Sequence, residues 1–393
     1  MLIRWRIGNL LSICLTLSGL GRGITEVARF GFRVDASSQI GSGHVMRCLT
    51  LADVLMERGV TCLFIMRKHP GHLQQQVLDS GHDVIMLPEP SVLAENDNAD
   101  ESSAHASWLG VGWDTDARET LESIASDTLD FLVVDHYALD YRWESFVSQS
   151  VGHLMVIDDL ADRKHECDVL LDQNLGRETS DYGSLVPSAT TKLIGARYAL
   201  LRPEFKLARR RSLAARTHRE PCSLFVSMGG VDRENVTANV LHIIEGIAEL
   251  SGWNVTVVLG SACPHVASVS GLAETMSLKT RVIVNAGNMS ELMTEADLAI
   301  GAAGGSAWER CCLGLPALLV VMAENQRQGT HSLESLGAAL SVGAPYEIGG
   351  TLAPSLRQAL VPGELARMSG IAAGVCDGNG ADRVVDVLMK AIA

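Results

Sequence analysis

A histidine that follows a glycine-rich turn is the feature of the sequence best suited to catalysis. Gly41 and Gly43 precede His44, and Arg47 comes one helical turn later. The glycines permit a tight turn and close approach of a ligand, and the pattern places His44 in the first turn of a predicted helix. A helix N-terminus disfavours the imidazolium form, so a neutral ring there can accept a proton. The pattern predicts His44 as a general base, with Asp35 and Arg47 in support. A capping or packed histidine is the simpler alternative.

Two glycine turns in the second half of the chain are suited to binding an anion. The turn at 227–235 reads SMGGVDREN, and the turn at 301–309 reads GAAGGSAWE. Main-chain N–H groups in turns between a strand and a helix can hold phosphate oxygens. Each turn alone fits an ordinary strand-to-helix connection, but two of them opposite a histidine turn favour a ligand site. The candidate ligand-binding residues are Gly229, Gly230, Gly304, Gly305, Ser306, Glu309, Asn325 and Gln326.

Several familiar motifs are absent from the sequence. It contains no Gly-Lys dipeptide and hence no P-loop, no complete G-x-G-x-x-G, and no G-x-S-x-G. An ATPase, a dehydrogenase with the dinucleotide fingerprint and an α/β-hydrolase are therefore disfavoured. Asp114 and Asp116 form a lone D-x-D, as in metal-dependent sugar-nucleotide enzymes, but no third ligand is evident. We therefore expect no metal site and no cofactor.

Short apolar runs alternate with amphipathic segments and predict two parallel-sheet domains. The predicted strands lie at 30–35, 60–66, 84–87, 131–135 and 154–158, and then at 224–227, 255–259, 282–284, 298–301 and 317–321. Such alternation is typical of βαβ units. The fold class is therefore α/β, with two Rossmann-like domains that face each other across a cleft. We place the N-terminal domain at 30–203, a linker at 204–221 and the C-terminal domain at 222–393.

Charge and cysteine content limit the partners and the compartment. The 32 Lys and Arg against 46 Asp and Glu give a net charge of −14, which disfavours a general nucleic-acid binder. The arginine-dense segment at 202–222 is therefore interpreted as a solvated linker. Nine cysteines without a C-x-x-C pair indicate a reducing, cytoplasmic location. The apolar start at 1–29 predicts a leader or upstream-start extension outside the fold, and the folded part is not expected to bind a membrane. Nothing indicates the oligomeric state.

The motifs together resemble those of a known family. The segments at 32–51, 133–137, 157–163, 172–174, 227–230 and 304–316 are similar to those of the UDP-2,4-diacetamido-2,4,6-trideoxy-β-L-altropyranose hydrolases. These enzymes act in pseudaminic acid biosynthesis and are related to the GT-B glycosyltransferases of the MurG type. The resemblance covers roughly residues 30 to 390 and implies a GT-B fold whose second domain binds UDP.

The resemblance also implies residue roles. It makes His44 the catalytic base, with Gly41 and Gly43 shaping its loop and Tyr137 in a supporting role. The candidate ligand-binding residues named above would face the nucleotide or the sugar. The implied reaction is attack of water at C1 of the UDP-sugar, with inversion and without metal. A GT-B glycosyltransferase and a UDP-sugar binding module without catalysis remain alternatives, and the sugar stereochemistry comes from the resemblance alone.

Overall fold

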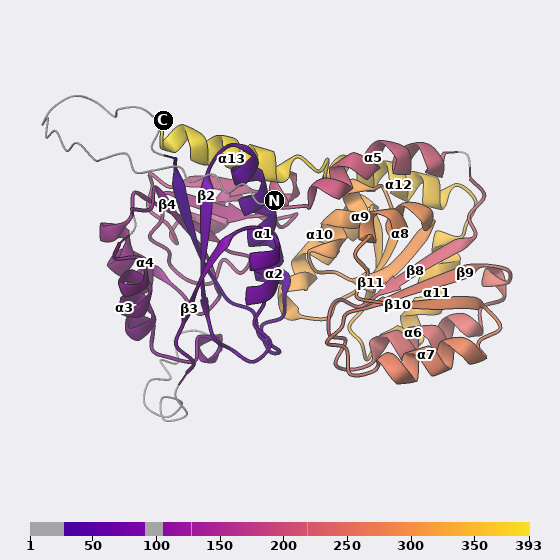
Figure 1. Cartoon of the computed structure of the whole chain (residues 1–393). Helices are drawn as coiled ribbons and strands as arrows, with labels where there is room; N and C mark the ends of the chain where they lie inside the picture. The colour runs from indigo at the N-terminus through magenta and orange to yellow at the C-terminus, as the bar shows by residue number, and fades with distance from the viewer. Residues whose placement is uncertain (1–26, 91–104, 127, 218) are drawn as a thin grey trace, which may run out of the picture.

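The chain forms two lobes, each built on one parallel sheet (Figure 1). The structure is a computed structural model that describes residues 27–90, 105–126, 128–217 and 219–393. The apolar start of the chain therefore falls almost wholly outside the described residues. The first sheet has seven strands in the order β3-β2-β1-β4-β5-β6-β7, and the second has six in the order β10-β9-β8-β11-β12-β13. This confirms the predicted α/β class with two parallel-sheet units.

The first lobe is a sheet with helices on both faces. Figure 1 shows α1 and α2 on one side and α3 and α4 on the other. Strands that are covered on both faces are apolar almost throughout, as in β1, where Phe30, Phe32 and Val34 are fully buried. The strands are β1 (Arg29–Val34), β2 (Thr61–Arg67), β3 (Asp83–Leu87), β4 (Phe131–Asp135), β5 (His153–Ile157), β6 (Val169–Asp172) and β7 (Thr191–Ile194). The helices are α1 (Gly43–Glu57), α2 (Gln74–Asp79), α3 (Trp113–Ser123) and α4 (Tyr141–Val147), with short 3₁₀ turns η2 (Ala106–Trp108), η3 (Ser148–Ser150), η4 (Thr179–Tyr182) and η5 (Ala196–Tyr198).

The second lobe repeats this plan. Its strands are β8 (Ser223–Ser227), β9 (Asn254–Leu259), β10 (Lys279–Val284), β11 (Leu298–Ala302), β12 (Ala317–Val320) and β13 (Ala339–Gly343). Its helices are α6 (Val236–Glu245), α7 (Val266–Thr275), α8 (Met289–Glu295), α9 (Ser306–Cys312), α10 (Arg327–Leu336), α11 (Ile348–Ala359) and α12 (Glu364–Val375), with 3₁₀ turns η6 (Ala248–Leu250) and η7 (Glu324–Gln326). Two apolar clusters, one on each face of the sheet, form its core.

Both sheets have a point at which the strand order reverses. In the first sheet the chain proceeds outward from β1 to β2 and β3, and then returns to β4 on the other side of β1. In the second it proceeds from β8 to β9 and β10 and returns to β11. The strand ends at such switch points leave room for a ligand, because the following connections diverge there. The β1/β4 and β8/β11 pairs therefore locate the site in each lobe.

Two segments connect the lobes. Helix α5 (Pro203–Arg216) leads into the second lobe, and α13 (Gly380–Ala391) returns to the first, where Figure 1 shows it beside α1. Ala381, Val384 and Leu388 of α13 are buried in the apolar core of the first lobe. Sequence analysis had placed this helix in the second domain, since an amphipathic pattern does not show which core the helix covers.

The arginines of the predicted linker are not simply solvated. The Nη1 atom of Arg209 donates to the carbonyl oxygens of Cys312, at 2.6 Å, and Cys376, at 2.9 Å. The Nη1 atom of Arg216 donates to the carbonyl of Ala296 at 2.5 Å. These guanidinium groups satisfy carbonyls at helix ends of the second lobe, which attaches α5 to that lobe. Within the residues that the structure describes, no helix is both long enough and apolar enough to span a bilayer.

Candidate active site at the junction of the lobes

The histidine loop lies at the end of β1 and leads into α1. Gly41 has φ of +84°, a conformation that glycine adopts without strain. Ser42 precedes the helix, which begins at Gly43, so His44 lies in its first turn as predicted. Ser42 and Gly43 are exposed, whereas the His44 side chain is only 10% exposed. The loop thus presents its backbone to the surroundings and holds the imidazole largely buried.

Asp135, the last residue of β4, fixes the His44 ring. The Nδ1 atom of His44 lies 2.6 Å from Oδ1 of Asp135. A carboxylate only accepts hydrogen bonds, so this contact favours the tautomer with its proton on Nδ1 and leaves the lone pair on Nε2. No hydrogen-bond partner of Nε2 is found among the residues that the structure describes. The ring is thus held in one orientation with Nε2 free to accept a proton, which is the geometry that a general base requires.

Arg47 joins Asp135 to a second carboxylate, that of Asp159. Its Nε and Nη2 atoms each lie 2.6 Å from an oxygen of Asp135, and its Nη1 lies 2.5 Å from Asp159. Burial would raise the pKa of Asp135, but the charge of Arg47 and a smaller contribution from His44 outweigh it and hold that pKa well below its ordinary value. Asp135 therefore stays ionised beside the imidazole, with the Arg47 guanidinium as its partner.

Tyr137 completes this group. Its hydroxyl donates to Asp159 at 2.8 Å, and its ring meets the His44 ring edge-on with centroids 4.6 Å apart. Burial raises the pKa of Tyr137 well above its ordinary value, so the phenol stays protonated and remains a donor. We call His44, Arg47, Asp135, Tyr137 and Asp159 the histidine cluster.

Asp35, which was predicted to support His44, belongs to a separate buried network. Both of its oxygens pair with Arg33, at 2.7 and 2.9 Å. The N–H of Ala138 donates to Nδ1 of His136, so Nε2 of that ring carries the proton and points to Asp35 at 3.3 Å. The described hydrogen bonds do not link Asp35 to His44. Its role is to neutralise Arg33 beneath the strands.

The D-x-D pair does not form a metal site. Asp116 is fully buried and pairs with Arg33 and Arg67, each at 2.6 Å. Asp114 is on the surface and pairs with Arg118. In the described part of the chain no three His, Cys, Asp or Glu side chains group as a metal site would require. The two aspartates therefore differ in function, and Asp116 is a structural ion-pair residue.

Aromatic side chains line the edge of the histidine cluster. The His105 ring lies 4.5 Å from that of Trp108 and 5.3 Å from that of Tyr137, between centroids. Trp108 stacks on Tyr137 at 5.8 Å. His105 and Trp108 are partly exposed and come from η2 and the residue before it. They give the cluster an apolar wall, of the kind that positions small ligands.

The glycine turn after β8 meets the histidine loop across the junction of the lobes. Gly229 has φ of +91°, which again favours glycine. A Cβ on Gly230 would lie 3.9 Å from Oγ of Ser42, two residues before His44. Arg233, just beyond this turn, donates to the carbonyl of Ser38 in the histidine loop. The structure thus brings the predicted base and the first predicted anion-binding turn together.

The second glycine turn leads from β11 into α9. A Cβ on Gly304 would lie 3.4 Å from Nε2 of Gln326, whose Oε1 accepts from the N–H of Met322 at 3.0 Å. Gly305 and Asn325 are exposed and Ser306 is partly exposed. Glu309 instead pairs with Arg202 at 3.4 Å, and burial raises its pKa. Gly304, Gly305, Ser306 and Gln326 therefore form one surface, whereas Glu309 is already engaged at the start of α5.

The sequence relatives include a hydrolase. No protein-family model matches the chain. A protein of Campylobacter jejuni subsp. jejuni named UDP-2,4-diacetamido-2,4,6-trideoxy-beta-L-altropyranose hydrolase is 24% identical over 306 residues, which are 78% of this chain and 96% of the relative. Spore coat polysaccharide biosynthesis protein SpsG of Bacillus subtilis is 31% identical over 150 residues, 38% of this chain and 43% of that protein. An uncharacterized protein of Methanocaldococcus jannaschii is 23% identical over 75% of this chain, which spans only 56% of that relative. The predicted resemblance is confirmed.

The solved structures that match the chain are similar over nearly its whole length. MurG of Acinetobacter baumannii has a TM-score of 0.66 at 12% identity and covers 93% of this chain and 99% of MurG. The calicheamicin glycosyltransferase CalG4 has a TM-score of 0.58 at 14% identity, over 94% and 99% of the two chains. LpCGTa in complex with UDP has a TM-score of 0.63 at 15% identity, over 94% and 100%. The chain has the GT-B fold.

Within the GT-B fold, sequence analysis missed four residues of the site. Asp135 and Asp159 were not assigned a role, although Asp135 ends one predicted strand and Asp159 directly follows another. Aspartates at the carboxyl ends of neighbouring parallel strands meet at one edge, and this signal would have found them. His105 and Trp108 lie outside every predicted strand and motif, and no local pattern indicates that they reach Tyr137.

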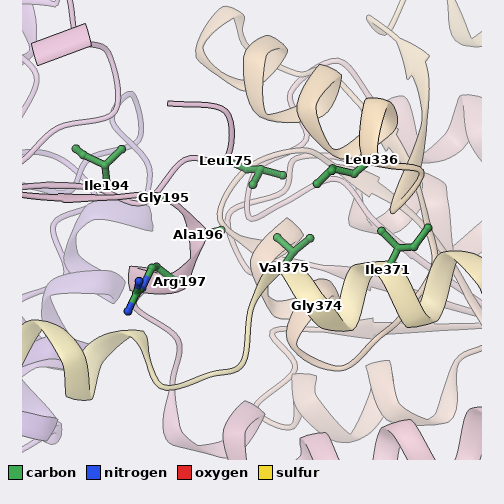
Figure 2. Close-up of a pocket in the computed structure, with 9 residues that line it drawn as sticks. All are labelled: Leu175, Ile194, Gly195, Ala196, Arg197, Leu336, Ile371, Gly374 and Val375. Atoms are coloured by element: carbon green, nitrogen blue, oxygen red, sulfur yellow. The ribbon is translucent and has the colours of Figure 1, made fainter. Parts of the chain in front are cut away.

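A separate pocket lies where the two lobes of the GT-B fold are joined (Figure 2). It has a volume of about 440 Å³ and extends between the 194–197 segment and helices α10 and α12. Figure 2 shows Ile194, Leu336 and Val375 among its aliphatic lining, with Arg197 at one side. Its lining includes none of the predicted site residues.

Proposed function

We propose that the chain hydrolyses a UDP-linked sugar, UDP-2,4-diacetamido-2,4,6-trideoxy-β-L-altropyranose, to the free sugar and UDP. The observation that carries this proposal is the His44 imidazole, fixed through Nδ1 by Asp135 at 2.6 Å, in a loop that faces the Gly229–Gly230 turn. A base in one lobe beside an anion-binding turn in the other is what hydrolysis of a sugar nucleotide requires. The similarity to the Campylobacter hydrolase supports the sugar, and the UDP complex of LpCGTa supports the nucleotide.

In the proposed step, His44 activates water. Nε2 takes a proton from a water molecule as its oxygen forms a bond to C1 of the sugar. The bond from C1 to the β-phosphate oxygen breaks, and its electron pair leaves with UDP. Attack from the face opposite the leaving group inverts the configuration at C1. Asp135 stabilises the imidazolium that forms, as the carboxylate does in catalytic triads.

The second lobe would stabilise the departing diphosphate. UDP leaves as an anion of low basicity, so it needs charge stabilisation more than a proton. The N–H groups of the Gly229–Gly230 and Gly304–Ser306 turns, with Asn325 and Gln326, are the proposed donors. Neither this stabilisation nor the activation of water needs a metal ion. All eight described cysteines are free thiols, which fits the proposed cytoplasmic location.

Incubation of the full chain with the UDP-sugar in ¹⁸O-labelled water tests the proposal. We expect free sugar that carries the label at C1, UDP without label, and by immediate NMR the anomer opposite in configuration to the substrate. Label in UDP would show attack at phosphorus and would overturn the mechanism. Retention of configuration would also contradict it.

A glycosyltransferase is the second candidate, because the chain shares its fold with CalG4. It would transfer the sugar to an acceptor hydroxyl in place of water. The same incubation separates the two functions, since a transferase turns over only after an acceptor is added. A binding module would retain UDP-sugar intact under both conditions.

A further inference from the structure

Arg310 of α9 is a buried cation without a carboxylate partner. The residue is 1% exposed. Its Nη2 donates to the carbonyl of Ala302 at 2.6 Å, and its Nη1 donates to Oγ of Ser306 at 3.3 Å. Its Nε is buried without any hydrogen-bond partner. Among the described residues, no carboxylate lies within ion-pair distance of its guanidinium group.

This lack of a counter-charge distinguishes Arg310 from the other fully buried arginines. Arg33 and Arg67 are equally buried, and both pair with Asp116 at 2.6 Å. The acidic neighbour of Arg310, Glu309, pairs with Arg202 instead. An isolated buried charge is costly, and burial lowers the pKa of Arg310 to about 10. The structure therefore holds a positive charge in the second lobe that an anion would balance.

Arg310 lies beneath both glycine turns. A Cβ on Gly301, at the end of β11, would lie 2.8 Å from Nη1 of Arg310 and 2.6 Å from the carbonyl oxygen of Ser227, at the end of β8. The guanidinium group thus lies at the β8/β11 switch point, from which the 227–230 and 301–306 turns both start. A side chain larger than that of glycine at position 301 would collide with the guanidinium group of Arg310.

The contact with Ser306 determines the direction of that hydroxyl. A guanidinium group only donates, so Oγ of Ser306 is the acceptor, and the hydroxyl hydrogen remains available for another group. Ser306 is partly exposed and opens the second glycine turn into α9. A hydroxyl that accepts from a cation is polarised toward donating to an anion.

We propose that Arg310 is a positioning residue for a bound diphosphate, which it stabilises by its charge and by holding the Ser306 hydroxyl as a donor. The inference rests on the proposed function, because the diphosphate is that of the UDP-sugar. The guanidinium group itself does not touch the ligand. It acts through Ser306 and through its charge beneath the main-chain N–H groups.

The test is a double-mutant cycle on ligand binding by the full chain, measured calorimetrically with UDP, uridine and inorganic pyrophosphate. We expect Arg310→Met and Ser306→Ala each to lower the affinity for UDP about tenfold or more, the scale of losing a charge-assisted hydrogen bond. The double variant should lose less affinity than the product of the two single losses, because the two residues act together. Arg310→Lys, which keeps the charge, should retain more affinity than Arg310→Met. If Arg310→Met does not fold, the cycle is run with Arg310→Lys.

The outcomes separate this inference from the proposed function. The inference would be overturned if the Arg310 variants bound UDP with unchanged affinity. It would also be overturned if the loss in the double variant equalled the product of the two single losses. In both cases the proposed function would stand. Wild-type protein that binds pyrophosphate but not UDP would overturn the proposed nucleotide, and the cycle would then decide the role of Arg310 with pyrophosphate. Wild-type protein that binds neither would overturn both.

Discussion

The two switch points of the molecule have the same topology and opposite chemistry. At β1/β4 the strand ends carry the histidine cluster, in which Arg47 is shared by Asp135 and Asp159. At β8/β11 they carry glycine turns, and the charged group beneath them, Arg310, has no carboxylate partner. A dense side-chain network can fix a tautomer and move a proton, whereas exposed main-chain N–H groups over an unbalanced cation can hold an anion. One topology thus serves two halves of one proposed reaction.

This difference predicts that substitutions in the two lobes will separate turnover from nucleotide binding. Changes at the first switch point should lower kcat and leave UDP affinity intact. Changes at the second should weaken UDP binding and also lower kcat, because the same groups are proposed to stabilise the departing diphosphate.

The largest effect is expected from His44→Ala or His44→Gln. Loss of the positioned base should lower kcat by ~10²-fold or more, with little change in UDP affinity. Steady-state kinetics and UDP calorimetry measure the two quantities, and His242→Ala, an exposed histidine of the second lobe, is the control. An unchanged kcat would remove His44 from the mechanism.

Asp135→Asn should have the next largest effect. An amide nitrogen placed opposite Nδ1 would donate to it and shift the imidazole proton to Nε2, where it blocks acceptance of a proton from water. We expect kcat to fall about 10²-fold, the lower end of the range for a lost acid–base contribution, again with UDP affinity retained. Asp79→Asn, on the surface of the first lobe, is the matched control. Full activity in a folded Asp135→Asn protein would show that the ring needs no such partner.

The first lobe should also be the more sensitive to acid. Burial would raise the pKa of Asp158, but Arg163 outweighs it and lowers that pKa to about 2, from an ordinary 3.8. A carboxylate whose pKa is lower in the folded than in the unfolded state stabilises the fold at pH values above its ordinary pKa. This contribution is lost as the pH falls through the folded-state pKa, so the free energy of unfolding decreases by about 2 kcal/mol between about pH 4 and pH 2. In the second lobe the lowered pKa of Glu249 is that of an exposed group, and the more strongly lowered pKa of Asp377 belongs to the segment between α12 and α13, outside the second sheet. Amide hydrogen exchange at pH 3 should therefore show β4 and β5 losing protection before β8 and β11. Equal loss in both lobes would contradict this.

The smallest of these effects is expected from Gly229→Ala. At φ of +91° an alanine is strained, so the turn should relax, weaken UDP about 10-fold and lower kcat to a smaller extent. Gly271→Ala is the control, because that glycine lies in α7 and a Cβ there would meet open space. A lower kcat with unchanged UDP affinity would assign this turn to catalysis instead.

Local patterns were enough to predict most strands and the histidine loop. Short apolar runs identified the central strands, because strands buried on both faces are apolar almost throughout. Strands β6, β7 and β13 were missed, since the polar residues Asp172, Lys192 and Ser341 interrupt their short apolar runs. Runs this short do not show a clear period.

Contacts between distant residues could not be predicted in the same way. His44 and Asp135 are 91 residues apart, and the sequence offers Asp35, directly before the loop, as the simpler partner. The choice between them depends on Arg33, which occupies both oxygens of Asp35. Likewise, Arg310 is one of several arginines in the sequence, and only its burial without an acid distinguishes it.

The return of α13 to the first lobe has a consequence for biosynthesis. Strands β1 to β7 are synthesised long before the α13 residues that complete their apolar core, among them Val384 and Leu388. The apolar core of the first lobe is therefore complete only after α13 has been synthesised. Deletion of Gly380–Ala391 would leave this part of the core uncovered, although every strand of the first sheet would be present.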